Sequence, residues 1–456
     1  MSTAKTKIRD FTQGNITKQL VTFAFPLFLS NLLQVVYNMV DMIVVGHVLG
    51  KEGLSAVSVG GDVTHLLTFI SMGFASAGQV LIARLIGGRQ EEKIGRFVGT
   101  MCGFLFSCAL TLTVLGLVFQ PAMLRLMNTP AESLAGAQSY ATVSMAGLLF
   151  IYGYNIVSAI LRGMGDSRHP FIFISLAAVL NLILDVVFVV VFRMGAGGAA
   201  LATIISQGVS FITCACFLIR HRAEYKLNIT LRHFVQWDQS MLLSLIKLGV
   251  PMAIKSASVM VSKLFVNSFI NAYGVAVSAF AGIANKLSSV SMLVSNAMNT
   301  AGSTVVGQNL AAGKFDRVKK ILLRIAYITL SMAALFSLVI MLFPEQIFGI
   351  FTADAAVMQI ARGYIPIAVL LFFGAAMRAI MNALINGSGH TKINFATAIL
   401  DGIVMRIGLA VLFGLVMHME YTGFWLGDAL AGFTPFLIGL VFYVTGAWKK
   451  QALKKA

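Results

Sequence analysis

Long apolar stretches recur along the whole chain. They are about 20 residues or longer and return roughly every 30 to 40 residues, and a helix of that length crosses about 30 Å of hydrocarbon. Of the 456 residues, 58% are hydrophobic and only 11% are charged. The mean hydropathy is +0.86, which is more apolar than the core of a soluble domain requires. We therefore expect an all-α polytopic membrane protein.

The apolar pattern predicts twelve transmembrane helices. They cover residues 18–49, 54–86, 94–119, 133–163, 170–192, 196–220, 240–271, 277–312, 318–343, 355–386, 392–417 and 422–447. The segment before the first helix is polar and basic, and that helix is longer than the apolar core of a signal peptide. We expect no cleaved targeting segment.

The 34 Lys and Arg residues collect in alternate loops. Twenty lie in the N-terminal segment and in one set of loops, and four more lie in the tail from Lys449 to Lys455. The other set of loops holds four, which are Lys51, Arg125, Arg193 and Arg362. This bias predicts that both termini are cytoplasmic, in the inner or plasma membrane of the cell. It also accounts for much of the net charge of +17, so we expect no nucleic-acid partner.

The chain contains an internal repeat. An offset of about 224 residues aligns Pro26 with Pro251, "LIGGRQEE" with "LAAGKFDR", and "RGMGDSRHP" with "NGSGHTKIN". The repeat predicts two parallel six-helix bundles related by a pseudo-twofold axis along the membrane normal. We expect an N-terminal lobe at 1–220, a cytoplasmic linker at 221–239 and a C-terminal lobe at 240–456. This design is typical of transporters, whose substrate site lies between the halves near the midplane.

Polar residues interrupt three predicted spans of the first half. In the first span they are three or four positions apart, which places them on one helical face. The fifth span adds an Asn and an Asp on one face, and the sixth adds hydroxyl and amide groups. The residues are Asn31, Gln34, Asn38 and Asp41, then Asn181 and Asp185, then Thr203, Gln207 and Ser210. Together they predict an oxygen-rich pocket.

Four of these residues suit a coupling ion. The carboxylates of Asp41 and Asp185, the amide of Asn181 and the hydroxyl of Thr203 offer the oxygen ligands that a hard cation such as Na⁺ prefers. The same site suits H⁺, because burial and a like-charged neighbour disfavour an ionised carboxylate. The alternative is that Asn181 and Asp185 only bond helices together. We expect H⁺ or Na⁺ here and no cofactor.

The second half carries different charges. Positions 41 and 185 correspond to about Val266 and Leu409, so the acidic pair is not repeated. Six cations lie in its spans, against Asp401 and Asp428: Lys247, Lys255, Lys263, Lys286, Arg378 and Arg406. Some of them snorkel to an interface or pair within their own half, as we expect for Lys247 and Arg406.

We assign five residues to a substrate cavity: Gln34, Asn38, Asn155, Lys263 and Arg378. Lys263 and Arg378 share helical faces with amide side chains. By hypothesis, these two cations either compete with the coupling ion for the first-half carboxylates or bind an acidic group on the substrate.

Several motifs in sequence order resemble the multidrug and toxic compound extrusion (MATE) family across essentially the whole chain. They are Pro26 and Asp41 in the first span, followed by "ARLIGG", "RGMGDSRHP", "NLILDVVFV", "GAGGAALAT" and "GFWLGDAL". The resemblance implies two six-helix bundles, alternating access, and export of small organic compounds driven by inward H⁺ or Na⁺. It also implies an ion site at Asp41, Asn181, Asp185 and Thr203, and a hinge at Pro26.

The seventh and tenth spans contain no acid, unlike those of the NorM-like branch. The resemblance therefore favours a DinF-like or MepA-like member that acts as a monomer in the lipid bilayer. The main alternative is a flippase for lipids or lipid-linked precursors from a related superfamily, because such a cavity is often cationic. An intramembrane enzyme is disfavoured by the lack of HExxH, GxSxG or clustered histidines. A channel fits an asymmetric ion site less well than a coupled transporter does.

Overall fold

The computed structural model describes residues 6–127, 129–352 and 354–450, and every regular element among them is a helix. Lys5, Lys454 and Lys455, which contribute to the predicted orientation, lie outside the described residues. Contacts divide the chain into two compact units, which are described separately below. Unit 1 contains the chain up to Asp10 and Phe25–Ala253, and unit 2 contains Phe11–Ala24 and the chain from Ile254 onward. The predicted lobe boundaries at 220 and 240 stay a prediction.

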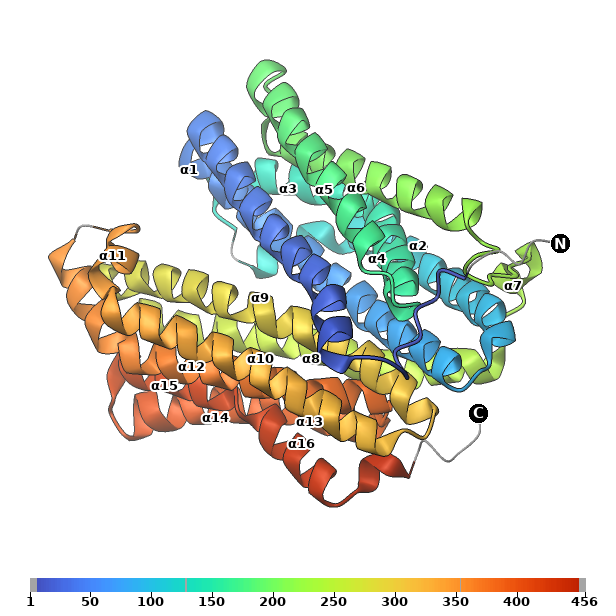
Figure 1. Cartoon of the computed structure of the whole chain (residues 1–456). Coiled ribbons are helices and arrows are strands. Elements are labelled where there is room, and N and C mark those ends of the chain that lie inside the picture. The colour runs from blue at the N-terminus through green and yellow to red at the C-terminus, as the bar shows by residue number, and fades with distance from the viewer. Residues whose placement is uncertain (1–5, 128, 353, 451–456) are drawn as a thin grey trace. The chain divides into compact units, whose positions relative to one another are not determined.

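Unit 1 is built from the helices of the first six predicted spans. They are α1 (Ile16–Gly87), α2 (Ile94–Leu126), α3 (Ala131–Ala146), α4 (Leu148–Gly163), α5 (Arg168–Asp185), α6 (Gly195–Arg220) and the short α7 (Leu231–Val235), with 3₁₀ turn η1 (Glu91–Lys93) and π-helix η2 (Val186–Val191). The first part of α8 (Gln239–Asn271) also belongs to this unit. Helices α5 and α6 run side by side (Figure 1).

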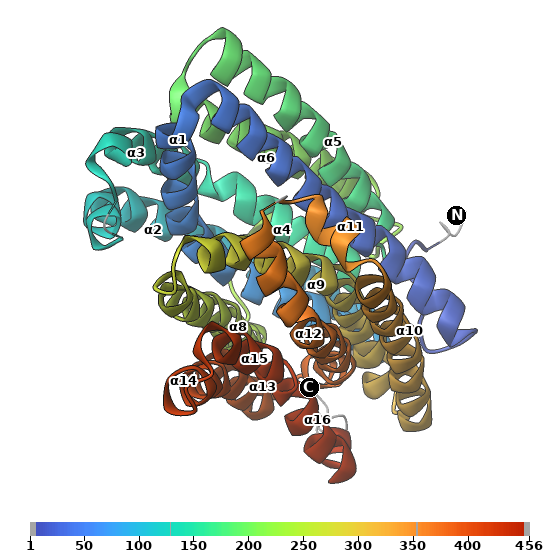
Figure 2. The ribbon, with the colours of Figure 1, turned by 90° about the vertical axis from the view of Figure 1, so that its left-hand side faces the viewer.

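Unit 2 holds the rest of α8 and the later helices. They are α9 (Val275–Ala311), α10 (Phe315–Leu342), α11 (Pro344–Gly349), α12 (Ala355–Ser388), α13 (Thr391–Ile399), α14 (Arg406–Val411), α15 (Glu420–Ala431) and α16 (Thr434–Val444), with η3 (Leu400–Met405), η4 (Leu412–Val416) and η5 (Ala447–Lys449). Segments α13 to η4 form the eleventh span, which contains two π-helical stretches. Helix α14 packs along α15 (Figure 2).

Twelve spans result. Ten of the described helices or joined helical segments are long and apolar enough to cross a membrane, and α3 together with α4 forms one further span, which is bent by 49°. Helix α1 supplies two spans, because Gly50 breaks it with φ 66° and ψ −160°, a conformation that only glycine adopts readily. This count confirms the predicted all-α fold. The helix α7 within the expected linker, and the bend at Gly147, were not predicted.

Two helices are shared between the units. The first residues of α1 belong to unit 2, and the first residues of α8 belong to unit 1. In α1 the change comes between residues 24 and 25, next to Pro26, and in α8 it comes between residues 253 and 254, close to Pro251. Proline inside a helix removes one backbone hydrogen bond. Each shared helix is therefore weakened where it passes from one unit to the other.

The N-terminal segment is fastened into unit 2 by buried contacts. Phe11 and Phe23 are buried, with ring centroids 5.2 Å apart. The Phe11 N–H donates to Gln308 Oε1 at 2.9 Å, and the Asn309 amide donates to the Phe11 carbonyl at 3.1 Å. The start of α1 therefore belongs structurally to unit 2, although it comes first in the sequence.

A buried carboxylate fixes the loop between α4 and α5, inside the "RGMGDSRHP" motif. Asp166 accepts backbone N–H bonds from Arg168 and His169 at 3.1 and 3.2 Å, and the Tyr225 hydroxyl donates to it at 2.6 Å. Burial disfavours the charged form, but the hydrogen bonds from His169 and Tyr225 outweigh burial and lower the pKa of Asp166. The motif thus has a structural role at the start of α5.

We predict that Asp166→Ala destabilises the protein by about 1–3 kcal/mol, since it removes several hydrogen bonds to a buried charge. Because the pKa of Asp166 is lower in the folded than in the unfolded state, its contribution is present above about pH 4 and is lost as the pH falls further. Thermal unfolding of the purified protein between pH 3 and 7 measures this. Equal melting temperatures for the variant and the parent at neutral pH would contradict it.

Candidate functional site

Two carboxyl groups meet inside unit 1. Asp41 lies in the first span of α1, and Asp185 is the last residue of α5. Their carboxyl groups lie close enough to interact electrostatically. Asp185 is 0% exposed and Asp41 is half-buried. Two adjacent negative charges in a largely buried site are strongly unfavourable. A cation bound to the carboxylate oxygens is therefore needed to compensate them.

Local features of α5 and α6 bring the other predicted ligands to this pair. The chain turns from α-helix to π-helix directly after Asp185, and π-helical turns recur at functional sites. Helix α6 begins with small residues, and a Cβ on Gly198 would lie 3.3 Å from Phe188, which follows α5 in η2. Such residues let membrane helices approach closely. Thr203 then comes within 3.4 Å of the Asn181 amide nitrogen, which donates to its hydroxyl.

A small cavity lies beside these residues. Helices α1, α5 and α6 line it with Tyr37, Ile174, Ala177, Ala178, Asn181, Thr203, Ser206 and Gln207. Its free volume is about 10 Å³, close to the minimum for one water molecule. This space suits an ion or a water molecule and is too small for an organic substrate.

Several acceptor oxygens around the pair have no hydrogen-bond partner among the described residues. They are Asp41 Oδ1, both carboxylate oxygens of Asp185 and, in the small cavity, Gln207 Oε1. Asn181 uses its amide nitrogen on Thr203, which leaves its amide oxygen as an acceptor. Buried acceptors without donors are costly. These oxygens therefore suit H⁺, which two carboxylates can share, and they suit Na⁺, which binds oxygen ligands.

Two tyrosines belong to this site and were not predicted. Tyr37 and Tyr140 lie close enough to Asp41 and Asp185 to interact electrostatically with both. Tyr37 is one helical turn before Asp41, on the predicted polar stripe, so the spacing of that stripe could have indicated it. Tyr140 comes from α3, and no local pattern in the sequence connects it to Asp41.

The other predicted residues of unit 1 lie at varied positions. Gln34 and Asn38 precede Asp41 on α1, where Gln34 is half-buried and Asn38 is exposed. Asn155 in α4 donates to Ser71 Oγ at 3.3 Å. Pro26 lies inside α1, beside the point where the helix changes unit.

Four intramembrane cations of unit 2 bond to polar side chains, and the two arginines among them pair with carboxylates. Arg378 forms an ion pair with Asp401 at 2.9 Å, and Arg406 pairs with Asp401 and Asp428. Arg406 therefore pairs within its own half instead of snorkelling. Lys255 donates to Asn382 Oδ1 at 2.7 Å, and Lys263 donates to Ser288 Oγ at 3.3 Å.

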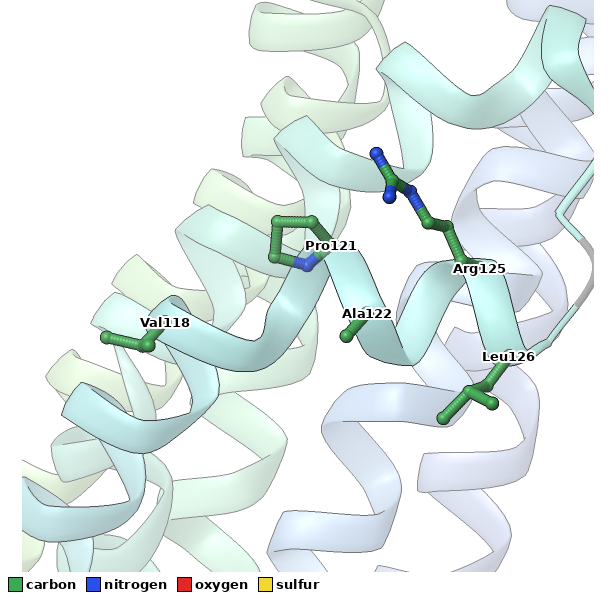
Figure 3. Close-up of a pocket in the computed structure, with 5 residues that line it drawn as sticks. All are labelled: Val118, Pro121, Ala122, Arg125 and Leu126. Carbon is green, nitrogen blue, oxygen red and sulfur yellow. The ribbon is translucent and has the colours of Figure 1, made fainter.

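Another hollow of unit 1 has a different character. It lies at the C-terminal end of α2 and is lined by Val118, Pro121, Ala122, Arg125 and Leu126 (Figure 3). All five come from one helix, none is acidic, and Val118 and Leu126 are exposed. It is an open surface hollow and offers no enclosed binding site.

The MatE family model matches the chain twice, over residues 26–187 and 251–412. Together these segments cover more than half of the 456 residues. The chain belongs to the MatE family. Each bound of the second match lies 225 residues after the corresponding bound of the first, which confirms the internal repeat.

Full-length relatives of this MatE protein carry transporter names. The probable multidrug resistance protein YpnP of Bacillus subtilis (strain 168) is 27% identical, and the alignment covers 98% of this chain and 99% of YpnP. Solved structures of MATE in bent and straight conformations are each 25% identical with a TM-score of 0.88. They cover 98% and 99% of this chain, and 99% and 100% of their own.

The family assignment settles the general class of this MatE protein. It is an integral membrane protein of a multidrug efflux transporter family, and its relatives are transporters and not enzymes. Family membership agrees with the twelve membrane spans and with small organic compounds as the class of substrate. The same family offers no reason to expect a cofactor.

We predict that a coupling cation stabilises the Asp41–Asp185 pair. Lowering the pH from 8 to 6, or adding Na⁺, is expected to raise the melting temperature of the parent, since a ligand of the folded state stabilises it. In Asp185→Asn this shift should fall to a small fraction of the parent value. Thermal unfolding in detergent measures it.

Asp62→Asn is the matched control, because Asp62 is another half-buried carboxylate in α1. It should keep the full shift of the parent. An equal shift in the parent and in Asp185→Asn would contradict the assignment of the site.

Proposed function

We propose that this protein is a secondary active antiporter that exports organic compounds by alternating access, driven by inward movement of H⁺ or Na⁺. The observation that carries the proposal is the proximity of two carboxyl groups, the buried Asp185 and the half-buried Asp41, which interact electrostatically. Both oxygens of Asp185 and Oδ1 of Asp41 lack donors among the described residues. Asn181 and Thr203 complete the proposed ion site through their amide and hydroxyl oxygens.

Competition provides the coupling. When the ion is bound, the charge of the pair is compensated and its carboxyl groups can remain buried together. When the ion leaves, two negative charges repel each other, and a different packing of α1 against α5 and α6 becomes favourable. A substrate that is bound more tightly in one of these packings is then exchanged for the ion. Gln34, Asn38 and Asn155 are the proposed substrate-facing residues of unit 1.

Pro26 is the proposed hinge of this change. It lies where α1 passes from unit 2 to unit 1, and it precedes Asp41 on the same helix. A proline weakens the backbone ladder locally, so α1 can bend there without losing the contacts that hold its first residues. Solved MATE structures at TM-score 0.88 include bent and straight conformations.

The remaining expectations follow the same proposal. We place both termini in the cytoplasm, because the basic loops alternate with loops of low charge. We propose a monomer in the inner or plasma membrane, of the branch that couples through its N-terminal lobe. The flippase alternative is kept by one observation, the cluster of intramembrane cations in unit 2.

The coupling is tested in proteoliposomes with pH and Na⁺ gradients imposed separately. We expect gradient-driven export of a fluorescent organic cation such as ethidium by the parent. Asp41→Asn and Asp185→Asn should export at the rate of protein-free liposomes, because each removes one of the two groups that hold the ion. Full gradient-driven export by both variants would rule out this ion site.

Asp62→Asn serves as the control in the same assay and should keep at least about half of the parent rate, since a substitution outside the ion site leaves coupling intact. Translocation of a fluorescent lipid, with no export of organic cations under either gradient, would support the flippase instead.

We further predict that Pro26→Ala stabilises α1 by up to about 3 kcal/mol as a helix while slowing transport. The variant should bind the organic cation with nearly parental affinity yet export it several-fold more slowly, because bending of α1 now breaks an intact hydrogen-bond ladder. Pro121→Ala in α2, which is outside the hinge, is the matched control. Parental export by Pro26→Ala would remove the hinge from the mechanism.

A further inference from the structure

Unit 2 contains a second cluster of charged side chains at membrane depth. It draws on α8, α12, η3, α14 and α15, which lie far apart in the sequence. Its members are Lys255, Lys263, Arg378, Asp401, Arg406 and Asp428. Each cation interacts electrostatically with at least one of the two carboxylates.

The cluster has an excess of positive charge. Four cationic side chains face two carboxylates, and both carboxylates are already engaged by Arg406. Lys255 and Lys263 bond to neutral acceptors, the amide of Asn382 and the hydroxyl of Ser288. An uncompensated charge inside a membrane protein is expensive. The described part of the chain therefore leaves about two positive charges to be balanced by something else.

The charges are arranged in two layers. Asp401 and Arg406 are buried, with side chains 0% and 3% exposed, and they form the closed part of the cluster. Arg378 is 12% exposed and Asp428 is 20% exposed. Lys255 and Lys263 are also only partly buried. Arg378, Lys255 and Lys263 thus keep some exposure, in contrast to Asp401 and Arg406.

Unused donors point to the chemistry of a balancing ligand. The buried Nε atom of Arg378 has no hydrogen-bond partner among the described residues, and the same holds for Arg406 Nε and Asp401 Oδ2 in the closed part of the cluster. A guanidinium fork and two ammonium groups match the oxygens of a carboxylate or a phosphate. A halide could also balance the charge, but it is a single atom and lacks the separate oxygens that match a planar guanidinium fork.

We propose that this cluster binds one compact oxyanion, a carboxylate or a phosphate, carried by the exported compound. The inference rests on the proposed transport function and adds a second substrate class beside organic cations: amphiphiles that bear an anionic group, zwitterions included. Lys255, Lys263 and Arg378 hold the oxyanion. Asp401 and Arg406 position Arg378 and keep the inner layer neutral.

Binding to the full-length protein in detergent tests this inference without requiring transport. The probe is dodecyl phosphate, titrated calorimetrically, with dodecyltrimethylammonium as the oppositely charged partner. We expect the parent to bind dodecyl phosphate at least about tenfold more tightly than it binds dodecyltrimethylammonium. We expect Lys263→Gln and Lys255→Gln each to weaken the binding of dodecyl phosphate about tenfold. Equal affinity for the two amphiphiles, or unchanged affinity in both variants, would overturn the proposal.

Lys286→Gln is the matched control. Lys286 is an exposed cation in α9, and its removal should leave dodecyl phosphate binding unchanged. A loss in this variant equal to that in Lys263→Gln would mean that binding follows overall charge and not the cluster. Both cluster variants should melt at or above the parental temperature, because each removes an excess charge.

Displacement by inorganic phosphate and binding to Asp185→Asn provide two further tests. Inorganic phosphate that displaces dodecyl phosphate supports recognition of the oxyanion alone. Failure of phosphate to displace it supports recognition of the headgroup together with its chain. Asp185→Asn, which should abolish coupled export, is expected to bind dodecyl phosphate like the parent. Retained binding in that variant separates this site from the proposed coupling mechanism, and loss of binding in it would contradict two independent sites.

Discussion

The proximity of Asp41 and Asp185 is the constraint on which the rest of unit 1 depends. Two neighbouring carboxylates in a largely buried site cannot both remain charged without a cation, because no described side chain donates a hydrogen bond to either oxygen of Asp185 or to Asp41 Oδ1. The small residues at the start of α6, the π-helix after Asp185 and the Asn181–Thr203 bond all hold oxygens around this pair. If the packing of α1 against α5 and α6 changes when the ion leaves, as proposed, the site is suited to an antiporter.

The two repeats share a helical pattern and differ in charge. The family model matches both with an offset of 225 residues, yet Val266 corresponds to Asp41 and the apolar pair Leu409 and Ala410 lies where Asp185 would recur. Unit 2 instead carries Asp401 within a π-helical stretch, where it holds two arginines. The repeats thus share a family pattern and differ in the chemistry of their buried charges.

The sequence predicted features that depend on composition and on helical spacing. The twelve spans follow from apolar length, and Asp41, Asn181, Asp185 and Thr203 follow from polar positions on apolar helices. The structure adds what depends on tertiary contact. Tyr140 reaches the ion site from α3, and each shared helix changes unit next to a proline. Neither is encoded in any local spacing, because the partners are far apart along the chain.

Binding of a coupling cation at the Asp41–Asp185 pair and binding of an organic substrate in its cavity are expected to exclude each other. The affinity of the purified protein for tetraphenylphosphonium, measured as a function of pH and of Na⁺ concentration, tests this most directly. The affinity of the parent should fall as the H⁺ or Na⁺ concentration rises, and Asp185→Asn should bind with an affinity independent of both. Affinity of the parent that is independent of both ions, or equal dependence in the variant, would contradict it.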